Sequence, residues 1–343
     1  MPSKLSKKSG WKVVQSKKRV QEKTKLAFLI LGLIVLVLVF SQAFRFTRTL
    51  FSSWKISNIQ RNYTWDGKLN INFLIRSKNL ALVSYNPTDK KITIINIPDR
   101  IYLESAGGFG SWLLSSLYDL GENQKNLGGD KLLRDTLVRF FAQPIDGVLD
   151  FSGEMKKKTA LGIVTSIRGN LIPISLLSNL KTNLTIIELL RLKLGLSSVR
   201  FDKVSEVNLE DSLTNDRLLD GTEVLVADPN KLDLALVDFI DPKIKNEHKT
   251  VVIFNGTDKA LFAQDWARLV ANIGGSVIFT TNAQKQIDKT LVVGEASLTR
   301  ARLSEVFNSS CKESDCDKIQ KSDEDFSSSR GQINIKLAPD LVN

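Results

Sequence analysis

One stretch near the start of this chain contains only uncharged residues, most of them apolar, whereas polar and hydrophobic positions are mixed everywhere else. The segment Leu26–Phe44 reads LAFLILGLIVLVLVFSQAF and carries no charge. As a helix it would be about 28 Å long, close to the thickness of a bilayer's hydrocarbon core. Residues 1–25 before it hold nine Lys or Arg residues against a single Glu. Because basic residues stay on the cytoplasmic side, the pattern predicts a single-pass protein of the cytoplasmic membrane, with its N-terminus inside and its C-terminal domains outside.

A cleaved signal peptide is the alternative interpretation of the same segment. Ser41-Gln42-Ala43 has the small residues of a cleavage site. The apolar run is long for the hydrophobic part of a signal peptide, and the basic tail before it is long as well. These two lengths favour an uncleaved anchor.

Beyond a stalk at residues 45–64, the pattern predicts an α/β domain over residues 65–241. Turn residues join two of its strands into a hairpin. Runs of consecutive apolar residues in these strands predict a sheet buried on both faces, so helices should cover it. The predicted strands are 69–75, 80–85, 92–97, 147–151, 199–207 and 222–227, and the predicted helices are 111–120, 130–141 with Asp130 as its cap, 175–196 and 232–239.

A charged segment with a proline, residues 242–249, predicts a domain boundary. After it the pattern starts again and predicts a small α/β domain over residues 249–343. Its strands are 250–254, 276–281, 291–294 and 333–337, its helices 263–273 and 297–307, and residues 312–330 are polar and predicted to be mobile. The fold class is therefore α/β, with a mixed sheet in the first domain.

Charge and rare residue types exclude several functions. Most of the net charge of +11 lies in the basic tail, so the remainder offers no broad basic surface and no nucleic-acid partner is predicted. The single histidine, His248, excludes histidine-dependent catalysis. Cys311 and Cys316 are too few for a zinc site, and they leave a disulfide or two free thiols as alternatives. Since no phosphate-binding loop, nucleophile elbow or metal-ligand cluster is present, neither a metal site nor a cofactor is predicted.

The order of elements resembles that of the LytR-CpsA-Psr family of cell-envelope proteins. Asn79–Leu103 resembles the family's hallmark hairpin, in which a strand ending in Asn-Pro, a Lys-Lys turn and a second strand lead into an Ile-Pro loop. Gln143–Gly147 and Leu180–Leu192 resemble later passages of the family's domain. Lys249–Val277, which opens with a strand and Asn-Gly-Thr, resembles the C-terminal domain often appended to it. The similarity covers about residues 65–343, and the basic tail and anchor fit the same architecture.

This resemblance implies a family-type α/β sandwich followed by a LytR C-terminal-type domain. The family's enzymes are similar to phosphotransferases that move a polyprenyl-pyrophosphate-linked glycopolymer onto peptidoglycan. Such chemistry needs arginine forks for the pyrophosphate, carboxylates for a divalent ion such as Mg²⁺, and an apolar slot for the lipid. The implied partners are therefore the membrane and a lipid-linked glycopolymer or peptidoglycan.

The resemblance also places the candidate site residues. Asp99 and Arg100 lie at the mouth of the implied pocket and are the candidate catalytic residues, with a solvated ion pair as the alternative. Arg76 and Arg168 are the candidate substrate-binding residues, with ordinary surface positions as the alternative. The leucine-rich stretch Leu189–Leu196 either lines a lipid slot or forms a core helix.

The sequence departs from the family at the phosphate-binding positions. Only Arg76-Ser77-Lys78 joins the first two strands, where the family has a longer acidic and Arg-bearing loop, and the Ile-Pro-Arg-Asp order reads Ile97-Pro98-Asp99-Arg100. Each lost phosphate fork would remove about 1.5–3 kcal/mol of charge-assisted hydrogen bonding. We therefore predict a protein that binds glycopolymer, a lipid-linked precursor or a partner without catalysis. An active phosphotransferase, using a divalent metal such as Mg²⁺, and an envelope-linked transcriptional regulator are the alternatives.

Overall fold

The computed structural model describes residues 30–38, 41, 55–56, 59, 61, 63–125, 127–151, 153–169, 180–309, 311 and 313–341. The chain divides into two compact units, residues 1–54 and 55–343. In the first unit residues 30–38 are helical, while the predicted tail, the rest of the predicted membrane helix except Ser41, and most of the predicted stalk lie outside the described residues. Among the described residues, no helix combines the length and the apolar character needed to cross a bilayer.

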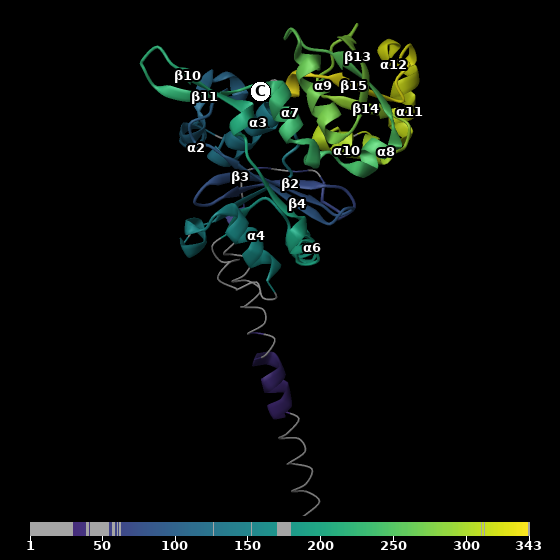
Figure 1. Cartoon of the computed structure of the whole chain (residues 1–343). Helices are drawn as coiled ribbons and strands as arrows, with labels where there is room; N and C mark the ends of the chain where they lie inside the picture. Colours follow the sequence, from purple (N-terminus) through teal and green to yellow (C-terminus); the bar gives the residue numbers. More distant parts are fainter. Residues whose placement is uncertain are drawn as a thin grey trace, which may run out of the picture. The chain divides into compact units, whose positions relative to one another are not determined.

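The second unit contains a seven-stranded mixed sheet with the strand order β1-β8-β7-β2-β3-β4-β9. Figure 1 labels β2, β3 and β4 of this sheet. The strands are β1 (Lys55–Ile56), β2 (Ile71–Arg76), β3 (Leu80–Asn86), β4 (Lys91–Ile97), β7 (Gly147–Phe151), β8 (Leu180–Thr182) and β9 (Val204–Val207). Strands β2, β4, β7 and β9 run in one direction and the other three run against them. The carboxyl ends of four strands therefore meet at one edge of the sheet, here called the carboxyl edge. The predicted α/β class and the β3–β4 hairpin are confirmed.

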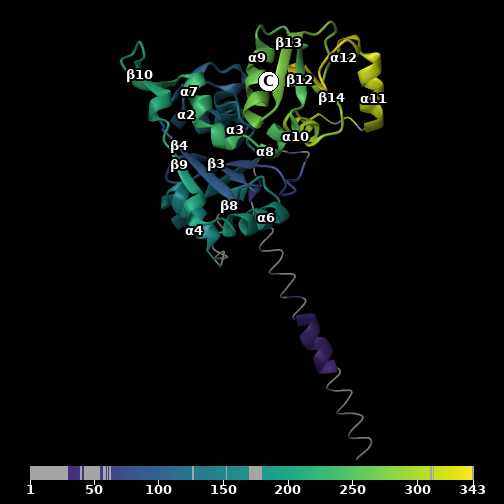
Figure 2. The same ribbon diagram turned by 45° about the vertical axis from the view of Figure 1, so that its right-hand side comes forward.

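Helices cover both faces of this sheet, as the buried strands predicted. Helices α4 (Ala160–Arg168) and α6 (Ile186–Ser197) pack on one face, and α2 (Leu114–Asn123), α3 (Gly129–Phe141) and α7 (Pro229–Ala235) lie on the other (Figure 2). Successive strand residues point to opposite faces, so Phe73 belongs to the first core, under α4 and α6, and Leu74 to the second.

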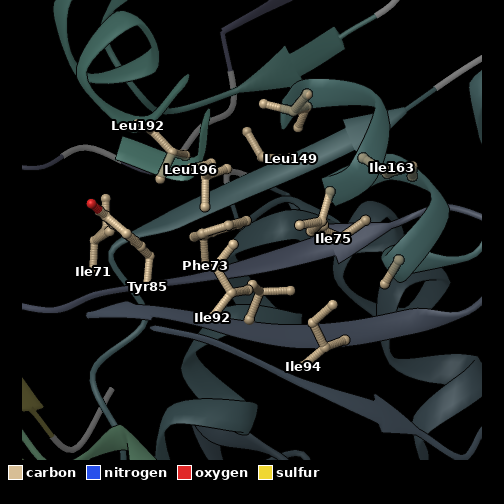
Figure 3. Close-up of a cluster of buried hydrophobic side chains, with 14 of the residues drawn as sticks. Ile71, Phe73, Ile75, Tyr85, Ile92, Ile94, Leu149, Ile163, Leu192 and Leu196 are labelled. Carbon is tan, nitrogen blue, oxygen red and sulfur yellow. The ribbon is translucent and has the colours of Figure 1, made fainter. Parts of the chain in front are cut away.

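Part of the leucine-rich stretch belongs to the first core. Figure 3 shows Leu192 and Leu196 of α6 above Ile71 and Tyr85, with Ile163 of α4 near Ile75. Leu192 and Leu196 are 2% and 0% exposed, so they are core residues.

Several predicted boundaries in the first domain were wrong. Of the predicted helix 175–196, residues 175–179 lie outside the described residues and Leu180–Thr182 is strand β8. Helix α6 begins at Ile186, because Thr185 and Glu188 form a capping box there. The predicted strand 199–207 is a strand only from Val204 on. Residues 111–113 are strand β6 (Ser111–Leu113), paired with β5 (Tyr102–Glu104), rather than the start of α2. The pattern also missed α4 and β10 (Leu213–Arg217), which pairs with β11 (Glu223–Ala227).

The second part of the unit holds a four-stranded sheet with the order β13-β12-β15-β14. Its strands are β12 (Thr250–Asn255), β13 (Ser276–Asn282), β14 (Leu291–Gly294) and β15 (Ile333–Leu337), and its helices α9 (Phe262–Ile273) and α10 (Leu298–Val306). These elements match the prediction closely, because their apolar period is regular and Gly274 ends α9 in the left-handed conformation.

Two segments of this part differ from expectation. The predicted linker 242–249 contains helix α8 (Pro242–Glu247), which Asp241 caps by accepting from two backbone N–H groups. The polar stretch predicted to be mobile contains α11 (Glu313–Ser322) and α12 (Glu324–Ser327). A disulfide joins Cys311 to Cys316, and the Cys316 side chain packs in a small core against β12 and β14. Tertiary packing and the disulfide hold helices that the polar sequence did not predict.

A buried carboxylate fixes the chain segment before β2 onto α6. Glu188 is fully buried and accepts from Arg61 at 2.5 Å and from the backbone N–H groups of Trp65 and Thr185 at 2.7 Å each. Burial by itself raises the pKa of Glu188, but the hydrogen bonds from Arg61, Thr185 and Trp65 outweigh it and hold the pKa below its ordinary value.

We expect Glu188→Gln to destabilise the protein by about 1.5–3 kcal/mol at pH 7, because charge-assisted hydrogen bonds are lost. A carboxylate with a lowered folded-state pKa contributes stability above its unfolded pKa and loses it as the pH falls through the folded value. The difference between variant and wild type should therefore shrink in acid, as followed by urea unfolding between pH 7 and pH 3. Glu154→Gln, at a carboxylate whose side chain is 87% exposed, is the control. A difference that stays constant with pH would contradict this role of the Glu188 charge.

Candidate functional site

A single row of paired residues crosses the sheet at its carboxyl edge. The register pairs Ile97 with Leu80, Leu80 with Arg76, Arg76 with Asp150, and Asp150 with Lys181. Directly paired residues point to the same face, here the face that carries the second core, and neighbouring strands are about 4.8 Å apart. The row changes from apolar residues on β3 and β4 to charged residues on β2, β7 and β8. In open α/β sheets ligands bind at this kind of edge.

The charged end of the row meets two helices and forms a cluster of five side chains, here called the charged cluster. Arg76 Nε lies 3.6 Å from Asp150, and its guanidinium lies 3.4 Å from the centre of the Tyr118 ring. Lys181 Nζ lies 2.6 Å from Asp130, which is 2% exposed. Two cations thus face two carboxylates, and the cluster is balanced in charge.

Close packing of α2 on α3 sets the position of Tyr118. A Cβ on Gly129 would lie 2.5 Å from the Tyr118 carbonyl oxygen, so only glycine allows this approach. The sequence prediction that Asp130 caps α3 was wrong: Glu122 of α2 accepts from the Gly129 N–H, and Asp130 turns inward to Lys181. The charged cluster therefore depends on the crossing of the two helices.

The pKa values in the charged cluster reflect its burial and its ion pairs. Burial raises the pKa of Asp150, and the nearby Asp130 raises it further, against the opposing effect of Arg76. Burial alone would lower the pKa of Lys181, but its hydrogen bond and ion pair with Asp130 raise it. At neutral pH the cluster holds both charge signs without a surplus of positive charge for a pyrophosphate.

Asp99 and Arg100 follow β4 at the same edge, and both are exposed. Their backbone is held in place, because the Ser115 N–H donates to the Asp99 carbonyl at 3.3 Å and the Leu225 N–H to the Arg100 carbonyl at 3.0 Å. The Arg100 side chain is 57% exposed and lies 3.4 Å from Glu223. Arg100 thus forms an exposed ion pair with Glu223, and the roles of Asp99 and Arg100 stay predictions.

Arg168 lies elsewhere. It ends α4 and donates to the Val199 carbonyl at 2.5 Å, with its guanidinium 5.8 Å from the Phe201 ring. Both partners precede β9, so Arg168 lies toward the edge where the strands begin. The structure does not bring it together with Arg76, the last residue of β2, or with Arg100, which follows β4.

A groove of about 520 Å³ lies at the carboxyl edge, beside the loop that carries Asp99 and Arg100. We call it the asparagine groove, because four of its lining residues are asparagines. Its walls are Asn79, Asn96, Ile97, Pro98, Asn208, Glu210, Leu213, Asn215 and Leu225. Glu210 is the one ionisable side chain among them. The lining combines neutral amide donors and acceptors with apolar surface.

One of these amides has an unsatisfied acceptor. The Asn96 side chain donates to Glu206 at 3.2 Å, while its buried Oδ1 atom has no hydrogen-bond partner among the described residues. A buried polar atom without a partner costs about 1–3 kcal/mol. The sequence did not predict this groove, because its asparagines are far apart in the chain. The only available signal was that Asn79 and Asn208 flank strand ends.

Two further clefts, of about 340 and 320 Å³, lie beside α3, the first against α9 and the second against the end of α10. The chain itself engages their arginines: Arg139 donates to the Leu341 carbonyl at 2.9 Å. Arg268 pairs with Asp233 at 2.7 Å. Within the described ranges, no group of three or more His, Cys, Asp or Glu side chains is placed to hold a metal ion.

No family model matches this chain, and no curated protein matches it. Solved structures do. B. subtilis TagV is 16% identical, with a TM-score of 0.38 over 49% of this chain and 94% of that chain. B. subtilis TagT is 16% identical, with a TM-score of 0.36 over 51% of this chain and 91% of that one. The LytR-CPS2A-psr family protein YwtF (TagT) with bound octaprenyl pyrophosphate lipid is also 16% identical, with a TM-score of 0.36 over 51% and 91%. The last of these structures carries the name of the family that the sequence resembles.

Proposed function

We propose that this chain is a membrane-anchored envelope protein that binds a hydroxyl-rich glycopolymer in the asparagine groove and does not transfer it. The groove is the observation that carries the proposal. Each asparagine amide provides two donors and one acceptor oxygen without charge, which suits the hydroxyl groups of a sugar or polyol chain.

The arrangement of the arginines supports binding over phosphoryl transfer. Transfer requires donors that converge on the phosphate oxygens. Here Arg76 faces Asp150 and Tyr118, Arg100 pairs with Glu223, and Arg168 donates to a backbone carbonyl. Each cation is engaged by its own chain, and Arg168 lies away from the other two.

The anchoring part of the proposal rests on the sequence and on the disulfide. Leu26–Phe44 holds the chain in the cytoplasmic membrane, with the basic tail inside and residues 45–343 outside. The Cys311–Cys316 disulfide supports the outer location, because disulfides persist in oxidising compartments and are rare in the cytosol. An anchored protein on this side of the membrane meets lipid-linked glycopolymers and peptidoglycan.

The test compares groove variants in the full chain held in detergent micelles. Two soluble probes, chitotetraose and poly(glycerol phosphate), are titrated by calorimetry. We expect at least one to bind, and the double variant Asn208→Ala/Asn215→Ala to raise its Kd by roughly tenfold or more, since each lost hydrogen bond contributes about 0.5–1.5 kcal/mol. Asn230→Ala, at an exposed asparagine of α7 outside the groove, is the matched control and should bind as wild type does.

Two results would contradict the proposal. One is binding of neither probe, or binding that the double variant leaves unchanged. The other is turnover of octaprenyl pyrophosphate in the presence of Mg²⁺ that Arg100→Ala abolishes, which would favour the phosphotransferase alternative.

A further inference from the structure

The outer face of α6 carries an apolar stripe that the described residues leave exposed. Ile187, Leu190 and Leu194 are 59%, 53% and 70% exposed. Their spacing of three and four residues places them on one side of the helix, opposite Leu192 and Leu196 in the first core. Phe201, just beyond the helix, is 71% exposed. Isolated exposed leucines are common, but four such residues on one short segment form a patch.

Basic residues accompany this patch. Arg191 lies on the exposed side of α6, where one of its guanidinium nitrogens donates to the Trp65 carbonyl at 2.7 Å. Arg200 and Lys203 flank Phe201. The one acidic residue of α6, Glu188, points inward and is fully buried. Asp202 is the acidic side chain beside Phe201, and it lies 3.1 Å from Arg200. An apolar stripe bordered by Arg and Lys is the pattern of a helix that lies in the interface of an anionic bilayer.

The length of chain between the anchor and the fold limits how far strand β1 can lie from the membrane. Ten residues separate Phe44 from Lys55, where strand β1 begins. Fully extended, the connection spans about 36 Å at most. Strand β1 pairs with β8, and α6 begins four residues after β8 ends. The tether therefore joins the fold at the strand pair that leads into α6.

We infer that the outer face of α6 docks on the surface of the bilayer that holds the anchor, with Ile187, Leu190, Leu194 and Phe201 in the headgroup region. This inference rests on the proposed anchoring and is independent of the asparagine groove. Docking gives the tethered unit one orientation, with α4 and α6 toward the membrane and the α2–α3 side of the sheet away from it. The basic neighbours bind the anionic lipid headgroups.

The experiment uses the full chain in nanodiscs that contain phosphatidylglycerol. The two native cysteines are joined to each other, so a cysteine introduced at Leu190 or Leu194 can be labelled selectively with a fluorophore. Lipids with a spin label in the headgroup region act as quenchers. Leu234→Cys, on α7 beside the second core, is the matched control, because its side chain is 76% exposed but lies on the other side of the sheet. We expect roughly twofold or stronger quenching at positions 190 and 194 relative to 234.

Each outcome has a distinct meaning. Equal quenching at all three positions, or none at 190 and 194 in chains that co-purify with the nanodiscs, would overturn the docking and leave the anchoring intact. Protein that elutes apart from the nanodiscs would overturn the anchoring and the docking together. A different result in detergent would assign the face to a second copy of the chain. In that case positions 190 and 194 would be inaccessible to solvent, and the labels of two molecules would lie close together. Replacing phosphatidylglycerol by a neutral lipid should weaken the quenching, since the basic residues then lose their partners.

Discussion

Replacing Arg302 by methionine should destabilise the protein by about 3–5 kcal/mol, the usual effect of removing one partner of a buried ion pair. Arg302 is 3% exposed and its guanidinium donates to Asp146, which is 1% exposed, at 2.8 Å. Tyr63 and the backbone N–H of Asn72 also donate to Asp146, and Glu305 lies 3.2 Å from the guanidinium. Without Arg302 this carboxylate would stay buried with neutral donors only.

The pair also holds two parts of the unit together. Arg302 comes from α10, beside the four-stranded sheet, and Asp146 directly precedes β7 of the seven-stranded sheet. Urea unfolding followed by circular dichroism measures the loss in the free energy of unfolding. Arg330→Met, at an exposed arginine of the same part, is the control, and its free energy of unfolding should stay within about 0.5 kcal/mol of the wild-type value. The double variant Arg302→Met/Asp146→Asn should lose less than the sum of the two single losses, because both charges are then gone. Additive losses would show that the two residues do not act as a pair.

Lys336→Met should lower the free energy of unfolding by a comparable amount, about 3–5 kcal/mol. Lys336 lies on β15 and is 0% exposed. Its Nζ atom lies 2.6 Å from Asp323 and 2.7 Å from Asp325, and 5.0 Å from the centre of the Phe326 ring. The lysine therefore fixes α12 and the end of α11 on the sheet. Methionine would fill similar space but would leave two carboxylates facing an apolar side chain.

The measurement separates charge from packing. Adding Asp323→Asn and Asp325→Asn to Lys336→Met should recover part of the lost stability, since no buried charge then lacks a partner. Lys285→Met is the control, because this lysine is 76% exposed and lies 3.8 Å from Glu324. It should change the free energy of unfolding by about 0.5 kcal/mol or less. Failure of the triple variant to recover any stability would indicate that Lys336 acts through packing and not through its charge.

Part of the candidate site was predictable from the sequence. The sequence singled out Arg76, which the structure places in the charged cluster, and the loop with Asp99 and Arg100, which borders the asparagine groove. It did not find Asp150 or Lys181, because their meeting with Arg76 follows from strand order and register. The sheet places β7 beside β2, and no local pattern in the sequence encodes that neighbour.

The sequence by itself determined the α/β class, the hairpin of β3 and β4, and nearly all of the four-stranded part, because alternating or continuous apolar residues and turn residues are local signals. The uncharged segment of bilayer length behind a basic tail is also a local signal, and it predicts a membrane anchor. Only the tertiary structure decided which polar residues meet: Arg302 with Asp146, Lys336 with two aspartates, and four distant asparagines along one groove. It also held polar helices such as α11 that their own sequence would not predict. Periodicity reports which face of an element is buried, whereas the partners of a side chain depend on the register and crossing of elements far apart in the chain.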